Sequence, residues 1–271
     1  MRKILTFAVA FALFATTQAF AIIGVGAHYV MNTGSLKSDA GNAYTVDFGA
    51  LGEQSIGVRQ EKADGLKGIG FKLWIDLLPL VDIEGTLNIA ATRYQTFLDI
   101  PTITANGIES EEIEIKYTPD APYNMIFGNA SPIFGIVNGD LSITYPFELP
   151  VVPIRPYIGA GVSYFASIPL VNASFTKKML ESSDGLIDAL SDPTNPDNAA
   201  AASEIGSVLA KTLKDESYTT GIGGHAIIGF RIKPPIIPLA VYTNGKYYFG
   251  GNTNSQFTQG FVLEVGGGFA L

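Results

Sequence analysis

GFVLEVGGGFAL (260–271) separates into two different faces when every second residue is taken. One face carries Phe261, Leu263, Val265, Gly267, Phe269 and Leu271. The other carries Gly260, Val262, Glu264, Gly266, Gly268 and Ala270. Successive side chains of a β-strand point to opposite faces, so this pattern predicts a strand with a bulky apolar face and a face of small or polar residues.

The same alternation recurs along the chain. It is as clear in VDIEGTLNIAAT (81–92) and NGDLSITYPF (138–147). Five further segments fit it less cleanly: IIGVGAHYVM (22–31), KGIGFKLWIDLL (67–78), PYIGAGVSYFAS (156–167), YTTGIGGHAIIGFRIK (218–233) and LAVYTNGKYYFG (239–250). Eight alternating segments of about ten residues predict an all-β protein with eight strands.

Three of the connections are short, apolar and marked by proline. They lie within LWIDLLPLVDIEG (73–85), YPFELPVVPIRPYIG (145–159) and FRIKPPIIPLAVY (230–242). Proline cannot donate to a sheet ladder, so these residues are expected to end the strands: Pro79, Pro150, Pro153, Pro234 and Pro235. Soluble proteins usually build tight turns from Asn, Asp, Gly and Ser, whereas apolar turns suit the interface of a membrane.

The other four connections are long, near 32–66, 95–136, 168–217 and 251–257. Short turns at one rim and long loops at the other are typical of an eight-stranded antiparallel up-and-down transmembrane β-barrel. A lipocalin-like soluble barrel is the alternative, with its apolar face turned inward. The membrane version is favoured because glycines recur on the polar face, as a narrow interior requires, and because the strands lack a Lys- and Glu-rich outer face.

The loops carry secondary structure of their own in this prediction. AYTVDF (43–48) and SIGVRQ (55–60) are expected to form a hairpin, and GIESEEIEIKYTP (107–119) an acidic strand extension. That acidic run is read as a solvated face, with Ca²⁺ bridging of lipopolysaccharide phosphates as the alternative. In the third loop, apolar residues at helical spacing in 175–190 and 199–214 predict a short helical hairpin, against a mobile loop with nascent helix.

The first residues predict export. Arg2 and Lys3 precede the 12-residue apolar run Ile4 to Ala15, and Ala19-Phe20-Ala21 matches the site read by signal peptidase. A membrane anchor is the alternative, but the run is shorter than the ~20 residues of a spanning helix. We therefore expect residues 1–21 to be a cleaved signal peptide and residues 22–271 to be one outer-membrane β-barrel domain.

Composition narrows the possible functions. The chain has 25 acidic and 17 basic residues, two of the latter in the predicted leader, and no cysteine. Nucleic acid is therefore an unexpected partner, since binding phosphates needs a basic patch, and disulfide or thiol chemistry is impossible. After the leader, no apolar run reaches the length of a spanning helix. An exported, apolar chain without such helices is expected to be a closed barrel in an outer membrane.

Aromatic residues are expected in two girdles where the barrel would meet the headgroups of the bilayer. The lower girdle comprises Tyr145, Phe147, Phe230 and Phe269. The upper girdle comprises Tyr29, Tyr94, Tyr164, Tyr247, Phe249 and Phe261. Ordinary packing of aromatic residues in a sheet is the alternative.

The polar faces of the strands are expected to form a lumen network. Its members are Lys72, Asp76, Asp82, Glu84, Asp140, Arg155, His28, His225, Arg231, Lys246 and Glu264, with Asn88 beside them. An eight-stranded barrel is just wide enough for side chains to fill, so these groups should form a paired plug. The alternative is a proton relay or metal site around His28 and His225. The chain has no third histidine and no nucleophile or phosphate-binding motif, so neither an enzyme nor a cofactor or metal site is expected.

With its leader, eight alternating segments, short lower turns and terminal strand ending in GGGFAL, the chain resembles small outer-membrane barrels of the OmpA, OmpX and OmpW kind. The resemblance is architectural and transfers no functional residue; those barrels commonly end in Phe or Trp, whereas this chain ends in Leu271. It implies the outer membrane of a diderm bacterium, with periplasmic termini and extracellular loops. The implied partners are outer-membrane lipid, lipopolysaccharide and the barrel-assembly machinery.

Two functions follow from this reading. The first is a plugged barrel that anchors surface loops for envelope integrity, adhesion or surface recognition. The alternative, implied by the OmpW-like resemblance, is a narrow channel for small or apolar solutes gated by the third loop. A channel requires a continuous gap beside the lumen residues, whereas an anchor does not.

Overall fold

The structure is a computed structural model. It describes residues 23–47, 52–76, 80–104, 107–116, 131–147, 149, 153–181, 208, 212, 218–234 and 237–270. The predicted signal peptide lies outside these residues, as does the terminal Leu271. Within the described residues, no helix has the length and apolar character needed to cross a membrane.

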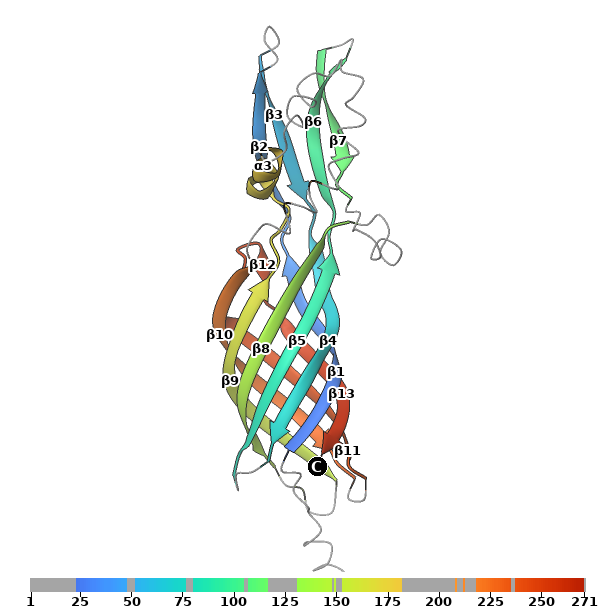
Figure 1. The fold of residues 1–271 in the computed structure, drawn as a ribbon, viewed down its shortest axis with the longest axis vertical. Helices are drawn as coiled ribbons and strands as arrows, with labels where there is room; N and C mark the ends of the chain where they lie inside the picture. The colour runs from blue at the N-terminus through green and yellow to red at the C-terminus, as the bar shows by residue number, and fades with distance from the viewer. Residues whose placement is uncertain are drawn as a thin grey trace, which may run out of the picture.

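Eight antiparallel strands close into a barrel (Figure 1). They are β1 (Ile23–Leu36), β4 (Ala63–Ile75), β5 (Asp82–Arg93), β8 (Ile133–Pro146), β9 (Ile154–Ser167), β10 (Thr219–Ile232), β11 (Leu239–Gly250) and β13 (Phe261–Ala270). Each strand pairs with the next in this order, and β1 closes the sheet by pairing with both β4 and β13. The predicted eight-stranded up-and-down barrel is therefore confirmed.

The short connections all lie at the end of the barrel that holds the C-terminus (Figure 1). Parts of the proline turns, including Pro79, Pro150 and Pro235, lie outside the described residues. At Pro153 two neighbouring turns meet, because its carbonyl oxygen accepts the N–H of Lys233 at 3.1 Å. Leu80, Leu149 and Ile237 are exposed at this rim, as expected for apolar turns.

A second sheet of four strands stands above the barrel (Figure 1). Its order is β2 (Asp39–Asp47), β3 (Glu53–Gln60), β6 (Thr96–Thr104) and β7 (Gly107–Glu114). The hairpin predicted in the first loop and the acidic strand predicted in the second are both present. The strand β6 was not predicted, because Pro101 within it argues against a central strand; here β6 lies between β3 and β7.

One helix, α3 (Ala173–Glu181), packs against β2 and β3 of this upper sheet. Asn172 caps it, because its side-chain oxygen accepts the N–H of Phe175 at 3.0 Å. Most of the second predicted helix, 199–214, lies outside the described residues, although Val208 and Thr212 are helical. The structure thus describes part of the first predicted helix, and the rest of the predicted hairpin lies largely outside the described residues.

The interior of the barrel has two layers. The lower and middle parts are polar, whereas the upper part is filled by apolar side chains that continue into the core of the upper sheet. Within the barrel this apolar layer includes Val30, Leu66, Phe134, Ile136, Phe165, Val262 and, from the short strand β12 (Phe257–Thr258), Phe257. The sequence did not reveal this layer, because inward-facing apolar residues such as Val30 and Val262 blur the alternation near the strand ends.

The outward face of the barrel is apolar around its circumference. Large exposed side chains include Val25, Ile69, Phe71, Leu73, Leu87, Ile89, Leu141, Ile143, Ile158, Val162, Ile222, Ile228, Val241, Val265 and Phe269. The aromatic residues assigned to the girdles are also exposed, with one exception: Tyr94 is buried. Placing Tyr94 in the upper girdle was therefore wrong, because it follows the end of β5 and joins the core beneath the third loop.

Glycines on the inward faces allow the narrow barrel to close. A Cβ atom added at Gly68 would overlap the carbonyl oxygen of Ile89, and one at Gly161 would overlap that of Leu141. At Gly70 it would overlap the side chains of His28 and Asn88. The strands thus approach one another too closely for a side chain at these positions.

Candidate functional site

The barrel interior brings the predicted lumen residues together. Nine of the eleven are buried, while Asp76 and Arg155 are partly exposed at the lower mouth. All eight strands or their immediate ends contribute a polar side chain. The four basic and five acidic side chains are arranged as linked ion pairs rather than as separate charges.

The lowest cluster is organised by Arg231 on β10. Its Nη1 donates to Asp76 at 3.0 Å and its Nη2 to Glu84 at 2.7 Å. The guanidinium carbon also lies 4.7 Å from the ring centre of Trp74, a cation–π geometry. Arg155 adds a second cation, with Nη1 3.3 Å from Asp76 and 3.4 Å from Asp82. Two arginines therefore pair with three carboxylates at the lower mouth, and Lys72 supplies the third cation at Glu84.

Lys72 on β4 connects this cluster to the middle of the barrel. Its Nζ lies 2.7 Å from Glu84 Oε2 and donates to the hydroxyl of Tyr157 at 2.9 Å. Tyr157 in turn donates to Asn244, and the amide of Asn244 donates to Glu264 Oε2 at 2.7 Å. The chain of contacts thus crosses the lumen from one wall to the other.

Lys246 on β11 is the centre of the network. Its Nζ lies 2.7 Å from Asp140 Oδ2, 2.7 Å from Glu264 Oε1 and 2.6 Å from Thr86 Oγ1. An ammonium group has three N–H donors, so all three have a partner here. Tyr248 completes the upper end of the network by donating to Asp140 Oδ2 at 2.9 Å.

His28 takes part in a directional relay of hydrogen bonds. Glu264 can only accept, so the amide nitrogen of Asn88 faces it at 2.8 Å and the amide oxygen of Asn88 faces His28 Nε2 at 2.6 Å. His28 Nε2 therefore donates, and Nδ1 accepts from the hydroxyl of Tyr242 at 3.1 Å in the neutral tautomer. The arrangement satisfies the ring without a metal or a substrate.

His225 is held in a similar way between two serines. Ser142 Oγ lies 2.8 Å from its Nε2, and Ser163 Oγ lies 2.8 Å from its Nδ1. The two histidines are therefore separate, and each is enclosed by its own hydrogen-bond partners. Among the described residues, no group of three or more His, Asp and Glu side chains is placed to hold a metal ion.

Apart from Asn88, sequence reasoning did not name the neutral members of this network. Tyr157, Tyr242, Tyr248, Asn244, Ser142 and Ser163 connect or enclose the charged groups. They occupy the same alternate positions along the strands as the predicted residues, so the alternation of faces could have identified them as inward-facing. The tyrosines were difficult to recognise because a tyrosine is equally at home on a lipid-facing surface.

The burial of the polar side chains limits which functions the barrel interior can have. Glu84, His225, Asn244, Lys246 and Glu264 have no solvent-exposed surface. Unpaired buried charges are very costly, which explains why each buried basic residue contacts at least one carboxylate. Above them lies the apolar layer. The interior is a packed polar core beneath an apolar one.

The upper sheet contains a second, exposed group of charges. Arg59 on β3 donates to Glu112 on β7 at 2.5 Å and to Glu61 at 3.0 Å, and it lies 4.4 Å from the ring centre of Phe97 on β6. The hydrogen bonds to Glu112 and Glu61 raise the pKa of Arg59 above its usual value. This group bridges three strands on the surface of the sheet.

Tyr94 joins the third loop to the upper core. The backbone N–H of Val171, just before α3, donates to the Tyr94 hydroxyl oxygen at 2.9 Å. Burial raises the pKa of Tyr94 above its usual value of 10.0, because the phenolate would lose its hydration.

Comparisons with known proteins follow the architecture. No known family model and no curated protein matches the chain. Among solved structures it is similar to the outer membrane protein OprG from Pseudomonas aeruginosa, at 10% identity and a TM-score of 0.41, over 91% of this chain and 94% of that one. It is also similar to Ail, the attachment invasion locus protein of Yersinia pestis, at 8% identity and a TM-score of 0.40, over 91% and 96%.

A third similar structure is Neisserial surface protein A, at 14% identity and a TM-score of 0.32, over 91% of this chain and 99% of that one. At these identities and TM-scores, the likeness carries nothing over to the residues or the activity of this chain. The chain itself is a small, closed, eight-stranded antiparallel β-barrel with a filled interior and a second sheet above it.

Proposed function

We propose that this protein is an integral β-barrel of the outer membrane that anchors a surface sheet and its loops, for envelope integrity, adhesion or surface recognition. The observation that carries the proposal is the inversion of the barrel: its outward face is apolar, while its buried interior holds the charges. A barrel that closes on itself leaves no unpaired edge, which is the requirement for strands in a bilayer.

The distribution of charge supports a lipid environment. Within the eight described barrel strands, the exposed charged residues are Asp64, Lys67 and Arg93, all near the upper ends of their strands. A soluble barrel would keep its outer face hydrated with many such residues. Placing the long loops and the upper sheet outside the cell, with both termini in the periplasm, follows the usual arrangement of such barrels. Insertion by the barrel-assembly machinery and contact with lipopolysaccharide are part of this proposal.

The packed lumen favours an anchor over the alternative of a narrow, loop-gated channel. A conduit would have to pass Lys246 and Glu264, whose side chains are fully buried and ion-paired, and then the apolar layer around Phe134. Opening such a path would separate buried charges, which is energetically costly. The upper sheet, by contrast, projects beyond the barrel and presents an exposed surface (Figure 1).

The test is a pair of measurements on the mature protein refolded into lipid vesicles and planar bilayers. We expect heat-modifiable migration and protection of the barrel from protease, together with a silent bilayer. Removing residues 175–214 should leave the bilayer silent, since the barrier lies in the lumen. Discrete current steps that increase on this deletion would favour the channel. Failure to insert into any vesicle would refute the membrane assignment itself.

A further inference from the structure

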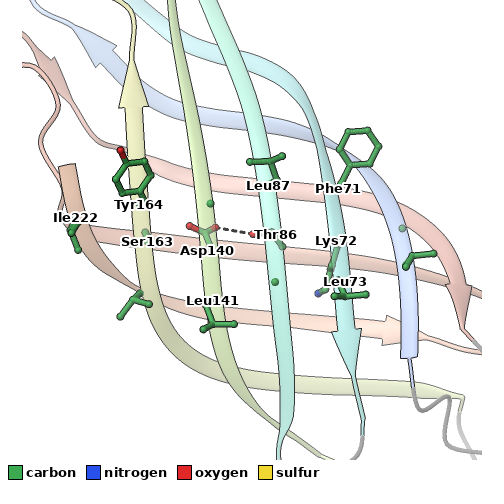
Figure 2. A pocket seen from close by; sticks show the side chains of 15 residues that line it. Phe71, Lys72, Leu73, Thr86, Leu87, Asp140, Leu141, Ser163, Tyr164 and Ile222 are labelled. Carbon is green, nitrogen blue, oxygen red and sulfur yellow. Dashed lines mark hydrogen bonds between the residues drawn. The ribbon is translucent and has the colours of Figure 1, made fainter. Parts of the chain in front are cut away.

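A groove crosses the apolar outward face of the barrel. Its volume is about 780 Å³, and it runs across strands β4, β5, β8 and β9 (Figure 2). Its outward-facing lining is almost entirely apolar and includes Phe71, Leu87, Leu141, Val162, Tyr164 and Ile222. Figure 2 shows Phe71 on one side of the groove and Tyr164 and Ile222 on the other.

Two glycines on adjacent strands form the floor of this groove. Gly85 on β5 pairs with Leu141 on β8, and Gly139 on β8 pairs with Leu87 on β5. A Cβ atom added at Gly139 would meet nothing within 4 Å, and one at Gly85 would meet only the carbonyl oxygen of Asp140, at 3.9 Å. Unlike the inward-facing glycines, these two are not required for close approach of the strands. They leave empty space on the outside.

Two exposed basic residues, Lys67 and Arg93, lie above the same strands. Lys67 is four residues above Phe71 on β4, a rise of about 13 Å. It pairs with Ala91 on β5, two residues below Arg93, so the two basic side chains are diagonal neighbours on one face. Both residues are exposed.

Among the described residues, few groups interact with Lys67 or Arg93. No ion pair is formed there by Lys67 or Arg93, and Arg93 donates only to the carbonyl oxygen of Ser131, at 3.3 Å. Two acids lie in this region, and each has another cation: Asp64 on β4 lies 2.9 Å from Lys62, and Glu114, which accepts from Ser131 at 3.5 Å, lies 3.1 Å from Lys116. The positive pair is therefore available to an anion at the level where the apolar surface ends.

We propose that the groove and the basic pair form one binding site for a lipid with a phosphorylated headgroup. An acyl chain lies in the groove over Gly85 and Gly139, and a phosphate lies between Lys67 and Arg93. Phosphate suits this pair, because arginine offers a fork of donors and lysine a compact charge. The inference rests on the proposed membrane location and adds the ligand class and its site. The occupant is lipid A, because the basic pair lies at the upper rim, which the proposed orientation places at the outer leaflet.

The experiment uses the mature protein in detergent micelles, with folding checked by heat-modifiable migration and circular dichroism. Native mass spectrometry then measures the retention of bisphosphorylated lipid A, phosphatidylglycerol and diacylglycerol. We expect both phosphorylated lipids to bind in competition and diacylglycerol to bind weakly. Lipid A should displace phosphatidylglycerol, and displacement in the opposite direction would overturn lipid A as the occupant. A folded barrel that retains all three equally overturns the site, whereas a barrel that does not fold or insert refutes the membrane proposal instead.

Three variants separate the two parts of the site. The double substitution Lys67→Gln with Arg93→Gln should weaken binding of the phosphorylated lipids roughly thirtyfold. Gly139→Leu, which fills the groove, should weaken binding of all three lipids about tenfold. Lys37→Gln with Lys177→Gln removes the same charge elsewhere and should change nothing. Equal losses in this control would show attraction to charge in general and overturn the proposal, as would unchanged binding in the first two variants.

Discussion

Lys246 on β11 and Glu264 on β13 form a buried ion pair, with Nζ and Oε1 2.7 Å apart and no exposed surface on either side chain. The same Nζ lies 2.7 Å from Asp140 across the lumen. One ammonium group thus holds together carboxylates from two walls of the barrel. The pair with Glu264 joins neighbouring strands, whereas the contact with Asp140 requires the sheet to curl round the lumen, so the second contact links stability of the interior to closure.

Removing this cation should be among the most destabilising single changes in the barrel. Lys246→Met leaves Asp140 and Glu264 buried without their partner, and breaking a buried pair in this way costs about 3–5 kcal/mol. Urea unfolding in lipid vesicles, followed by tryptophan fluorescence of Trp74, measures the loss. The double variant Lys246→Met with Glu264→Gln should lose less than the two single variants combined, because one unpaired charge is also removed. Additive losses would mean that the two groups do not interact.

Alanine substitutions of glycine should divide sharply by face. Gly68→Ala and Gly161→Ala place a methyl group on a neighbouring carbonyl oxygen, so they should destabilise the barrel by more than 1 kcal/mol, at about the lower end of overpacking costs. Gly139→Ala and Gly85→Ala enter open space and should be neutral or slightly stabilising. Thermal unfolding of the four variants under one condition makes the comparison. Equal destabilisation on both faces would show that inward and outward have been assigned wrongly.

Tyr94→Phe should loosen the third loop without unfolding the barrel. The buried N–H of Val171 loses its acceptor, at a cost of about 1–3 kcal/mol. Hydrogen exchange over residues 168–181 should accelerate, while exchange in β9 stays slow. Faster exchange throughout the barrel would contradict this local role.

Alkaline pH should have a related effect through the same residue. The pKa of Tyr94 is raised in the folded protein, so its neutral form is favoured there and the contribution to stability is complete below the usual value of 10.0. As the pH rises above 10, the released tyrosine ionises first and this contribution is progressively lost. Protease sensitivity of the third loop should therefore increase above this pH in the wild type, and less so in Tyr94→Phe. Equal pH dependence in both would show that another group controls the loop.

The barrel should fold without the first loop. The β1–β4 ladder continues to the pair Leu36 and Ala63, so a two-residue Asn-Gly turn can replace residues 37–62. We expect a folded, heat-modifiable barrel of reduced thermal stability, because Ile56 and Val58 no longer contribute to the upper core. Circular dichroism and gel migration provide the readout. Loss of insertion would show that the upper sheet is needed for closure.

Much of this architecture was readable in the sequence because alternation is a local property. In β13, Val265 and Phe269 are exposed while Glu264 is buried, as the period of two predicted. The same reasoning failed at Tyr94, which follows the end of a strand, where alternation no longer applies. It also missed β6, because proline is unusual within a strand and this one contains Pro101. It also did not identify the tyrosine and serine members of the lumen network, because these residue types occur on both the inward and the outward face of a barrel strand.

Alternation along the sequence was enough to predict the eight barrel strands, the two faces of each and the charged residues that share the interior. Which side chains meet there was settled by the tertiary structure, as for His28 and Tyr242, 214 residues apart along the chain. The tertiary structure also places apolar residues above the polar network, and it brings two outward-facing glycines side by side in a groove. The reason is physical: the face of a residue follows from its own strand, whereas its partners depend on inter-strand register and on closure of the sheet, which involve long-range contacts.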